Sequence, residues 1–127
     1  MKHSNRANWS NINHGGMNIL INLQRDEKKK KSYQDELRKY RIMLERRAKA
    51  FVDGAKDSGL VSLPYFGGFF ISIPCENPKM VQEKLKEDNF YIVANKNGLR
   101  FAVCAVNEEK CRNSAKIIKN AIDKLNK

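Results

Sequence analysis

One arginine lies in a stretch of sequence that is otherwise apolar. Arg100 belongs to residues 99–105, and all the remaining residues of this stretch are apolar. A guanidinium covered by such neighbours needs an anionic partner, because an unpaired buried charge is costly. Two partners meet this need: a carboxylate of the protein itself, or a ligand carboxylate that the planar guanidinium binds through paired hydrogen bonds. Arg100 is therefore the first candidate for a binding residue.

A second arginine lies in a polar segment near the start of the chain. Arg6 opens the run Arg6-Ala7-Asn8-Trp9-Ser10-Asn11. A tryptophan among asparagine and serine residues suggests a docking surface, because its large ring is rarely left in a free tail. Composition alone favours the plainer interpretation, an exposed arginine near the end of the chain. Both interpretations of Arg6 stay open at this point.

The motifs that mark common enzyme sites do not occur in the sequence. It has no dinucleotide-binding glycine motif, no phosphate-binding Walker loop, no zinc-protease motif and no serine-hydrolase elbow. His3 and His14 have no acidic or cysteine partner at metal-ligand spacing, so we expect no metal site. Cys104, in a strand, and Cys111, on a helix, are expected to be small buried hydrophobic residues. No residue of this chain is predicted to be catalytic.

The length and composition indicate one domain with a core of its own. The chain has 127 residues, of which 41% are hydrophobic, which argues against intrinsic disorder. No apolar run approaches the ~20 residues of a membrane helix, and the first residues lack an apolar signal region. Three cysteines without a CxxC pair suit reduced thiols. We expect a cytoplasmic protein that does not span a membrane.

The positive charge is concentrated in one segment. The chain carries a formal net charge of +11, and residues 25–49 hold eleven basic and five acidic residues, a net of +6. Clustered basic residues neutralise phosphates, so a basic nucleic-acid-binding α+β module is the alternative hypothesis. The expected strands lack the aromatic motif of RNA-binding sheets, and such charges usually lie on the solvated face of a helix. Nucleic acid is therefore the less favoured partner.

Apolar residues at steps of three and four predict a long helix in the N-terminal half. The stripe runs from Tyr33 to Ala55, with Ser32 as the expected N-cap and Gly59 as the C-terminal stop. The lysine run 28–31 either separates this helix from a shorter one or begins it. The shorter helix is expected to be buried on more than one side, because its apolar residues are Met17, Ile19, Leu20, Ile21 and Leu23.

Three short strands are expected in the second half of the chain. They cover Phe69–Ile73, Phe90–Ala94 and Leu99–Ala105. The last two are joined by Asn95-Lys96-Asn97-Gly98, and the Asn-Gly pair predicts a hairpin.

Two further helices complete the expected set of elements. Asn77 should cap the first, which turns Met80, Val81 and Leu85 inward, and Asn107 should cap the last. Helices layered on one face of a small sheet would bury all these apolar stripes, so the predicted fold class is α+β.

In these segments the sequence closely resembles the C-terminal small domain of class I pyridoxal-phosphate-dependent aminotransferases, in the aspartate and aromatic amino acid branch. Residues 6–11 resemble the family's Arg-Ala-Asn-Tyr-Ser-Asn segment, and residues 40–47 resemble the middle of its long domain-linking helix. Gly67-Gly68-Phe69-Phe70 resembles its Gly-Met-Phe strand. Gly98-Leu99-Arg100-Phe101-Ala102-Val103 looks like the strand with the substrate-binding arginine, and Asn107-Glu108-Glu109 opens the last helix as in the family.

The resemblance implies roles for particular residues. Arg100 matches the arginine that binds the substrate α-carboxylate. Arg6 matches the arginine that reaches across a dimer interface to the distal carboxylate of a dicarboxylic substrate in the neighbouring subunit. Ser10 and Asn11 would lie near that interface, and Phe69 near the substrate entrance.

The resemblance also implies a reaction, a cofactor and an assembly. The parent enzyme would be a homodimer that uses pyridoxal 5'-phosphate to move an α-amino group between aspartate or an aromatic amino acid and a 2-oxo acid such as 2-oxoglutarate. Trp9 stands where the family has tyrosine, and Ile12-Asn13 stands where it has two prolines. These departures leave the choice between dicarboxylic and aromatic substrates open.

The same resemblance places the cofactor machinery outside this chain. The covalent lysine, the aspartate beside the pyridine nitrogen and the phosphate-binding loop would lie in a large domain upstream of Met1. Residues 1–24 would lead into the domain and include the interface segment, and residues 25–127 would form the small domain. We expect the isolated chain to fold, to bind no cofactor and to be inactive.

Overall fold

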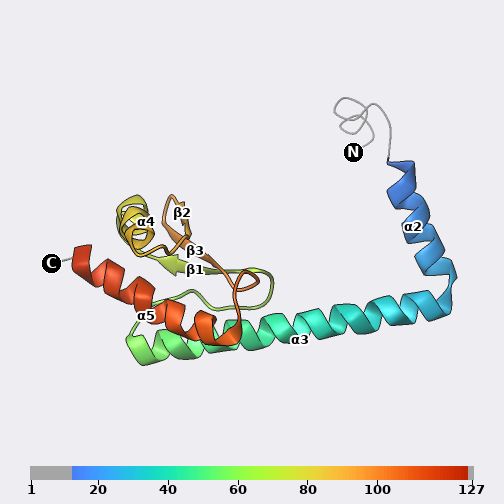
Figure 1. The fold of residues 1–127 in the computed structure, drawn as a ribbon, viewed down its shortest axis with the longest axis horizontal. Helices are drawn as coiled ribbons and strands as arrows, with labels where there is room; N and C mark the ends of the chain where they lie inside the picture. Colours follow the sequence, from blue (N-terminus) through green and yellow to red (C-terminus); the bar gives the residue numbers. More distant parts are fainter. Residues whose placement is uncertain (1–12, 126–127) are drawn as a thin grey trace. The chain divides into compact units, whose positions relative to one another are not determined.

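The computed structural model describes residues 13–125 of the chain. Its contacts divide at Lys39 and Tyr40 into two units, and each is described by itself. The element order confirms the predicted α+β class, with a small antiparallel sheet and several helices (Figure 1). The elements are α2 (His14–Arg25), α3 (Glu27–Ser58), β1 (Phe70–Pro74), α4 (Pro78–Glu87), β2 (Val93–Asn95), β3 (Gly98–Ala102) and α5 (Glu108–Leu125).

In the first unit, side-chain caps decide where the helices begin. The Asn13 side chain accepts a hydrogen bond of 3.0 Å from the Gly16 backbone N–H at the start of α2. Asp26 does the same for α3, where its carboxylate accepts from the N–H groups of Lys28 and Lys29. The predicted N-cap at Ser32 is therefore wrong, because the earlier Asp26 satisfies these first N–H groups. The lysine run 28–31 was predicted either to separate the two helices or to begin the second. In the structure it begins the second helix, α3.

The expectation that α2 is buried on more than one side is also wrong. No residue of α2 is buried, and Met17, Ile19, Leu20 and Ile21 are between 40 and 69% exposed. Periodicity identifies an apolar face, but that face is buried only where another element packs against it. Among residues 13–39 no element covers α2.

The second unit contains the hydrophobic core. The residues of α3 from Tyr40 onward bury Ala48, Phe51 and Ala55. The Phe51 ring stacks on that of Phe101 in β3, with ring centroids 4.5 Å apart. Gly54 lets α3 approach α5 closely, because a Cβ there would lie 2.3 Å from the backbone oxygen of Arg112. The core is completed by α4 and α5, which contribute Val81, Leu85, Cys111, Ala115, Ile118 and Ala121.

Gly59 ends α3 as the sequence predicts. Its φ of +70° is a left-handed conformation that glycine adopts without steric cost. The Gly59 N–H donates to the Lys56 carbonyl and the Leu60 N–H donates to the Ala55 carbonyl. This pair of bonds is the Schellman motif, which satisfies the last carbonyls of the helix.

The two asparagine caps behave differently. Asn107 caps α5 as predicted, with its side chain accepting from the Lys110 N–H at 2.9 Å. Asn77 occupies the N-cap position of α4, but its side chain makes no capping bond and its φ is +49°. Its backbone carbonyl instead accepts from Met80 and Val81. Val81 and Leu85 face the core as predicted, whereas Met80 is 58% exposed and that expectation is wrong.

The sheet has the strand order β1-β3-β2, and both pairings are antiparallel. Asn95 pairs with Gly98, so β2 and β3 form the predicted hairpin around a two-residue turn. β2 begins only at Val93, because the preceding residues form hydrogen bonds with α4. The Phe90 N–H donates to the Leu85 carbonyl, and the Gln82 side chain donates to the Ile92 carbonyl.

The third strand is shorter than predicted and ends at Ala102. A turn follows, in which the Ala105 N–H donates to the Ala102 carbonyl. Cys104 lies in this turn and is exposed, so the expectation of a buried cysteine in a strand is wrong for it. Cys111 is buried on α5, as expected.

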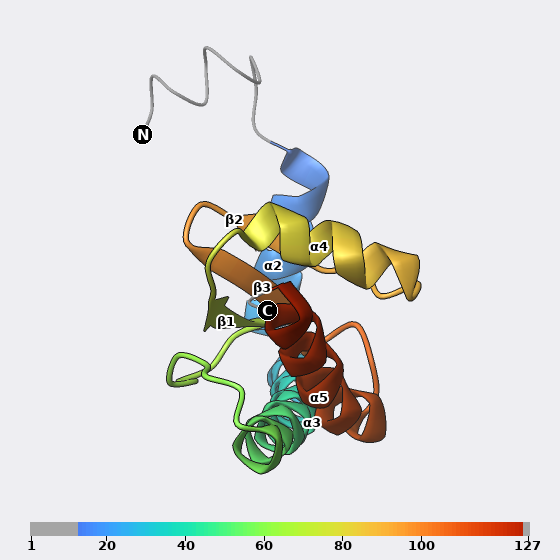
Figure 2. The ribbon, with the colours of Figure 1, turned by 90° about the vertical axis from the view of Figure 1, so that its left-hand side faces the viewer.

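The two faces of the sheet have different surroundings. Ile71 and Ile73 of β1 and Leu99 and Phe101 of β3 are buried, while their neighbours along each strand point to the other face. The helices of this unit pack on the first face, and Figure 2 shows α4 and α5 on the same side of β1 and β3. We call the other face, which carries Phe70, Ser72, Val93 and Arg100, the open face.

Candidate functional site

Arg100 lies at the centre of the open face. It is on β3, the middle strand, and its register partners are Ser72 on β1 and Val93 on β2. The strand alternation dictates this position, because Leu99 and Phe101 on either side point into the core. Arg100 is half-buried, whereas Ser72 and Val93 are exposed.

The guanidinium of Arg100 has an aromatic contact and an unsatisfied donor. Its Cζ lies 4.3 Å from the centroid of the Phe70 ring. Its Nε is buried and has no hydrogen-bond partner. Leaving such a donor unpaired costs about 1–3 kcal/mol.

No carboxylate among residues 13–125 forms an ion pair with Arg100. Other arginines do have protein partners: Arg41 pairs with Glu45, and Arg112 with Asp57. Arg47 donates to the Cys104 carbonyl at 3.1 Å. Of the two partners that the sequence allows for Arg100, this part of the chain does not supply a protein carboxylate.

Phe69 lies beside this site but not on the guanidinium. Its ring meets the ring of Phe70 edge to face, with centroids 6.5 Å apart. Phe70, which sequence reasoning treated only as part of a strand, is the residue that contacts Arg100. The signal that could have found it is the alternation of β1, since Phe70 and Ser72 share a face while Ile71 and Ile73 share the other.

A cavity of about 350 Å³ lies at the hairpin end of the sheet. Ser72, the register partner of Arg100, is part of its wall, together with Asn95 and Lys96 of the hairpin. The wall also includes the apolar Ile73, Pro74 and Leu99, and Arg100 is not part of it.

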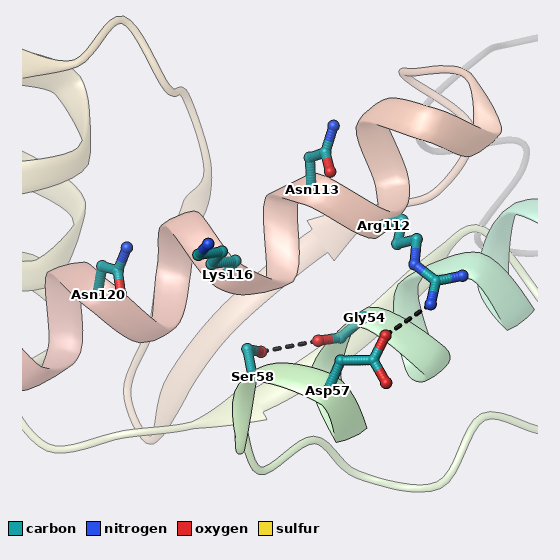
Figure 3. A pocket seen from close by; sticks show the side chains of 7 residues that line it. All are labelled: Gly54, Asp57, Ser58, Arg112, Asn113, Lys116 and Asn120. Carbon is teal, nitrogen blue, oxygen red and sulfur yellow. Dashed lines mark hydrogen bonds and ion pairs between the residues drawn. The ribbon is translucent and has the colours of Figure 1, made fainter.

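A second pocket, of about 320 Å³, lies between α3 and α5 (Figure 3). The Arg112 guanidinium pairs with the Asp57 carboxylate at 2.6 Å, and the Ser58 hydroxyl donates to the Gly54 carbonyl at 2.8 Å. These groups already satisfy one another, so this pocket offers a ligand less than the open face does. Its remaining wall consists of Asn113, Lys116 and Asn120.

Two of the three thiols, those of Cys75 and Cys111, are poor nucleophiles. Burial raises the pKa of the Cys111 thiol to about 11, and it also raises the pKa of Cys75. Both thiols are therefore protonated at neutral pH, whereas the reactive form of cysteine is the thiolate. Among residues 13–125, no group of three His, Cys, Asp or Glu side chains could hold a metal ion.

Three of the predicted site residues lie outside the described part of the chain. They are Arg6, Ser10 and Asn11. The predicted residues that the structure does describe, Arg100 and Phe69, lie in one cluster, joined by Phe70. None of the helices within residues 13–125 is long and apolar enough to cross a membrane.

The known structures most similar to this chain include three aminotransferases. The chain matches an aminotransferase from Anaerococcus prevotii over 95% of its own length, with a TM-score of 0.89 and 39% sequence identity. The α-aminoadipate aminotransferase LysN of Thermus thermophilus, complexed with N-(5'-phosphopyridoxyl)-L-leucine, matches 78% of the chain with a TM-score of 0.66 and 16% identity. An aminotransferase from Eubacterium rectale matches 65% of it with a TM-score of 0.54 and 24% identity.

These matches show the fold of one part of an aminotransferase. The chain spans only 29% of the length of the Anaerococcus protein, 29% of LysN and 22% of the Eubacterium protein. The last two matches, at 16 and 24% identity, show only a similar fold. Profiles of protein families and the sequences of curated proteins give no match to the chain.

Proposed function

We propose that this chain is the substrate-binding small domain of a pyridoxal-phosphate-dependent aminotransferase. The enzyme would move an α-amino group between aspartate or an aromatic amino acid and a 2-oxo acid such as 2-oxoglutarate. The observation that carries the proposal is the position of Arg100 at the centre of the open face, where no carboxylate of residues 13–125 forms an ion pair with it. The 39% identity with the Anaerococcus aminotransferase over nearly the whole chain supports it.

In this proposal Arg100 binds the α-carboxylate that all amino acid and 2-oxo acid substrates share. A guanidinium presents parallel N–H donors that match the two oxygens of a carboxylate, and such charge-assisted bonds are about twice as strong as neutral ones. The core-facing neighbours Leu99 and Phe101 hold the strand in place, so the position of Arg100 is set by the packed face of the sheet.

The cofactor would supply the electron sink for the α-carbon, and we propose that its covalent lysine is not among residues 13–125. None of their lysines is buried. The three that are partly covered, Lys30, Lys84 and Lys119, each pair with an acidic residue of the same helix. Reduction after addition of pyridoxal phosphate should mark no single lysine of the 127-residue chain, and selective labelling of one lysine would contradict this.

The test of Arg100 is kinetic and uses the intact protein that contains this chain. Arg100→Ala should lower kcat/KM by roughly 100-fold for every amino acid substrate, because it removes two charge-assisted hydrogen bonds. Arg112→Ala is the matched control, since that arginine is exposed and already paired with Asp57; it should leave kcat/KM unchanged. Equal effects of the two substitutions would contradict the proposal.

Arg6 is proposed to bind the distal carboxylate of a dicarboxylic substrate in the partner subunit of a homodimer, with Ser10 and Asn11 near that interface. Arg6→Ala should then reduce kcat/KM for aspartate much more than for an aromatic amino acid, because only aspartate has a second carboxylate. Equal losses for the two substrates would remove this role.

A further inference from the structure

The Phe70 ring and the Arg100 guanidinium are diagonal neighbours on the open face. Phe70 pairs with Ala102, two residues beyond Arg100 along β3, and diagonal pairs of this kind are within reach of long side chains. The 4.3 Å between the Cζ and the ring centroid is a cation–π contact. Phe70 is 44% exposed, so its ring is not part of the core.

This contact restrains the guanidinium without using its hydrogen-bond donors. The negative face of an aromatic ring attracts the cation, while the N–H groups of the two terminal nitrogens lie in the plane of the guanidinium and stay available to an anion. An acidic neighbour would also restrain the side chain, but it would compete with the ligand for the same donors. Among residues 13–125 no acidic residue pairs with Arg100.

The Phe70 ring is itself restrained. Phe69 meets it edge to face, and the carbonyl of Phe69 accepts the Val103 N–H at 2.9 Å, which holds this end of β1 against the chain after β3. A series of contacts thus leads from Phe69 through Phe70 to Arg100. A flexible arginine loses conformational entropy when it binds a ligand, and a side chain that is already restrained loses less.

We propose that Phe70 is the positioning residue of the carboxylate site: its ring holds the guanidinium of Arg100 in place before the ligand arrives and leaves its donors free. The proposal rests on the proposed function, in which Arg100 binds the substrate carboxylate. It adds a residue that does not touch the substrate and acts through Arg100.

The first test needs no ligand and uses the 127-residue chain. Protons above an aromatic ring are shielded, so the guanidinium N–H signals of Arg100 in a 15N-resolved NMR spectrum should be displaced upfield. Phe70→Leu should return them toward the position of an exposed arginine, and Phe70→Tyr should keep them displaced. Phe66→Leu is the matched control, because Phe66 is 96% exposed; it should change nothing at Arg100. Signals that do not respond to Phe70→Leu would overturn the proposal.

The second test measures carboxylate binding by titrating 2-oxoglutarate into the same chain, with sodium chloride as the reference for ionic strength. Phe70→Leu should weaken binding about three- to fivefold, the range of a partly exposed cation–π contact. Phe70→Tyr should restore it, and Phe66→Leu should bind like the unaltered chain.

The outcomes separate this inference from the proposed function. If Arg100→Ala binds 2-oxoglutarate as well as the unaltered chain does, Arg100 is not the carboxylate residue and the proposed function fails. If Arg100→Ala abolishes binding while Phe70→Leu binds normally, the proposed function stands and the role of Phe70 fails. Weaker binding by Phe70→Leu with a rescue by Phe70→Tyr supports both.

Discussion

The two faces of the three-stranded sheet are made by alternate residues of the same strands, yet their surroundings differ. Ile71, Ile73, Leu99 and Phe101 are at most 5% exposed under the helices, whereas Phe70 and Val93 on the open face are 44 and 46% exposed. The covered face is stabilised by apolar burial. The open face keeps a cation whose Nε has no partner. Stability is therefore expected to depend on one face and binding on the other.

The largest effect should come from the covered face. Phe101→Ala removes a buried ring that stacks on Phe51 and should lower the free energy of unfolding by about 3–5 kcal/mol. Urea unfolding followed by circular dichroism measures this. Phe66→Ala removes a ring of the same kind from an exposed position and should change stability by less than about 0.5 kcal/mol. Similar losses for both variants would contradict the contrast between covered and exposed aromatic residues.

A smaller effect should appear at alkaline pH, through the buried thiol on α5. Burial raises the pKa of Cys111 from 9.0 to about 11 in the folded protein. Between these values the unfolded chain ionises its thiol while the folded chain keeps it protonated. The contribution of this thiol to stability is thus full below about pH 9 and is lost as the pH rises toward 11.

The free energy of unfolding should therefore fall with pH more steeply in the unaltered chain than in Cys111→Ala. Cys104→Ala, which removes an exposed thiol, should keep the decline of the unaltered chain. A Cys111→Ala variant with the same slope as the unaltered chain would show that the Cys111 thiol is not shielded from water.

A substitution on the open face should increase the free energy of unfolding slightly or leave it almost unchanged. Arg100→Leu removes the unpaired Nε and the cation–π contact together, and these contributions nearly cancel. We expect the free energy of unfolding to stay the same or to rise by up to about 1 kcal/mol. A loss above about 2 kcal/mol would mean that Arg100 has a structural partner within the chain.

The smallest effect is expected in a test of nucleic-acid binding. Several basic residues of α3 pair with acidic neighbours, among them Lys29, Lys30, Arg41 and Lys49, which reduces the charge available to phosphates. Mixed oligonucleotides at low salt should therefore bind weakly or not at all. Tight binding that is lost steeply as salt increases would revive the hypothesis of a nucleic-acid-binding module.

Local signals in the sequence predicted several elements correctly. The cap at Asn107, the stop at Gly59 and the hairpin before Gly98 depend on neighbours a few residues away, so their physics is contained in short segments. The prediction of an N-cap at Ser32 is wrong because Asp26 offers an equivalent cap earlier in the chain. Met80 and Cys104 were misjudged because their exposure depends on where α4 and the turn after β3 meet the rest of the fold.

The candidate site could be predicted only in part. A charged residue among apolar ones identified Arg100, because such a charge requires a partner wherever the strand lies. Phe70 carries no comparable signal, since an aromatic residue in a strand is ordinary. Its contact with Arg100 exists only because β1 and β3 pair in a particular register.

The sequence alone determined the α+β class, the apolar stripes and the need of Arg100 for an anion, since these follow from residue types and their spacing. The tertiary structure decided which stripes are covered. Phe51 and Leu37 belong to the same apolar stripe, yet the Phe51 side chain is buried and that of Leu37 is exposed. Burial requires a second surface, which the spacing of residues does not specify. It also decided that the partner of Arg100 within residues 13–125 is an aromatic ring and not a carboxylate, because strand register brings together residues that are distant in the chain.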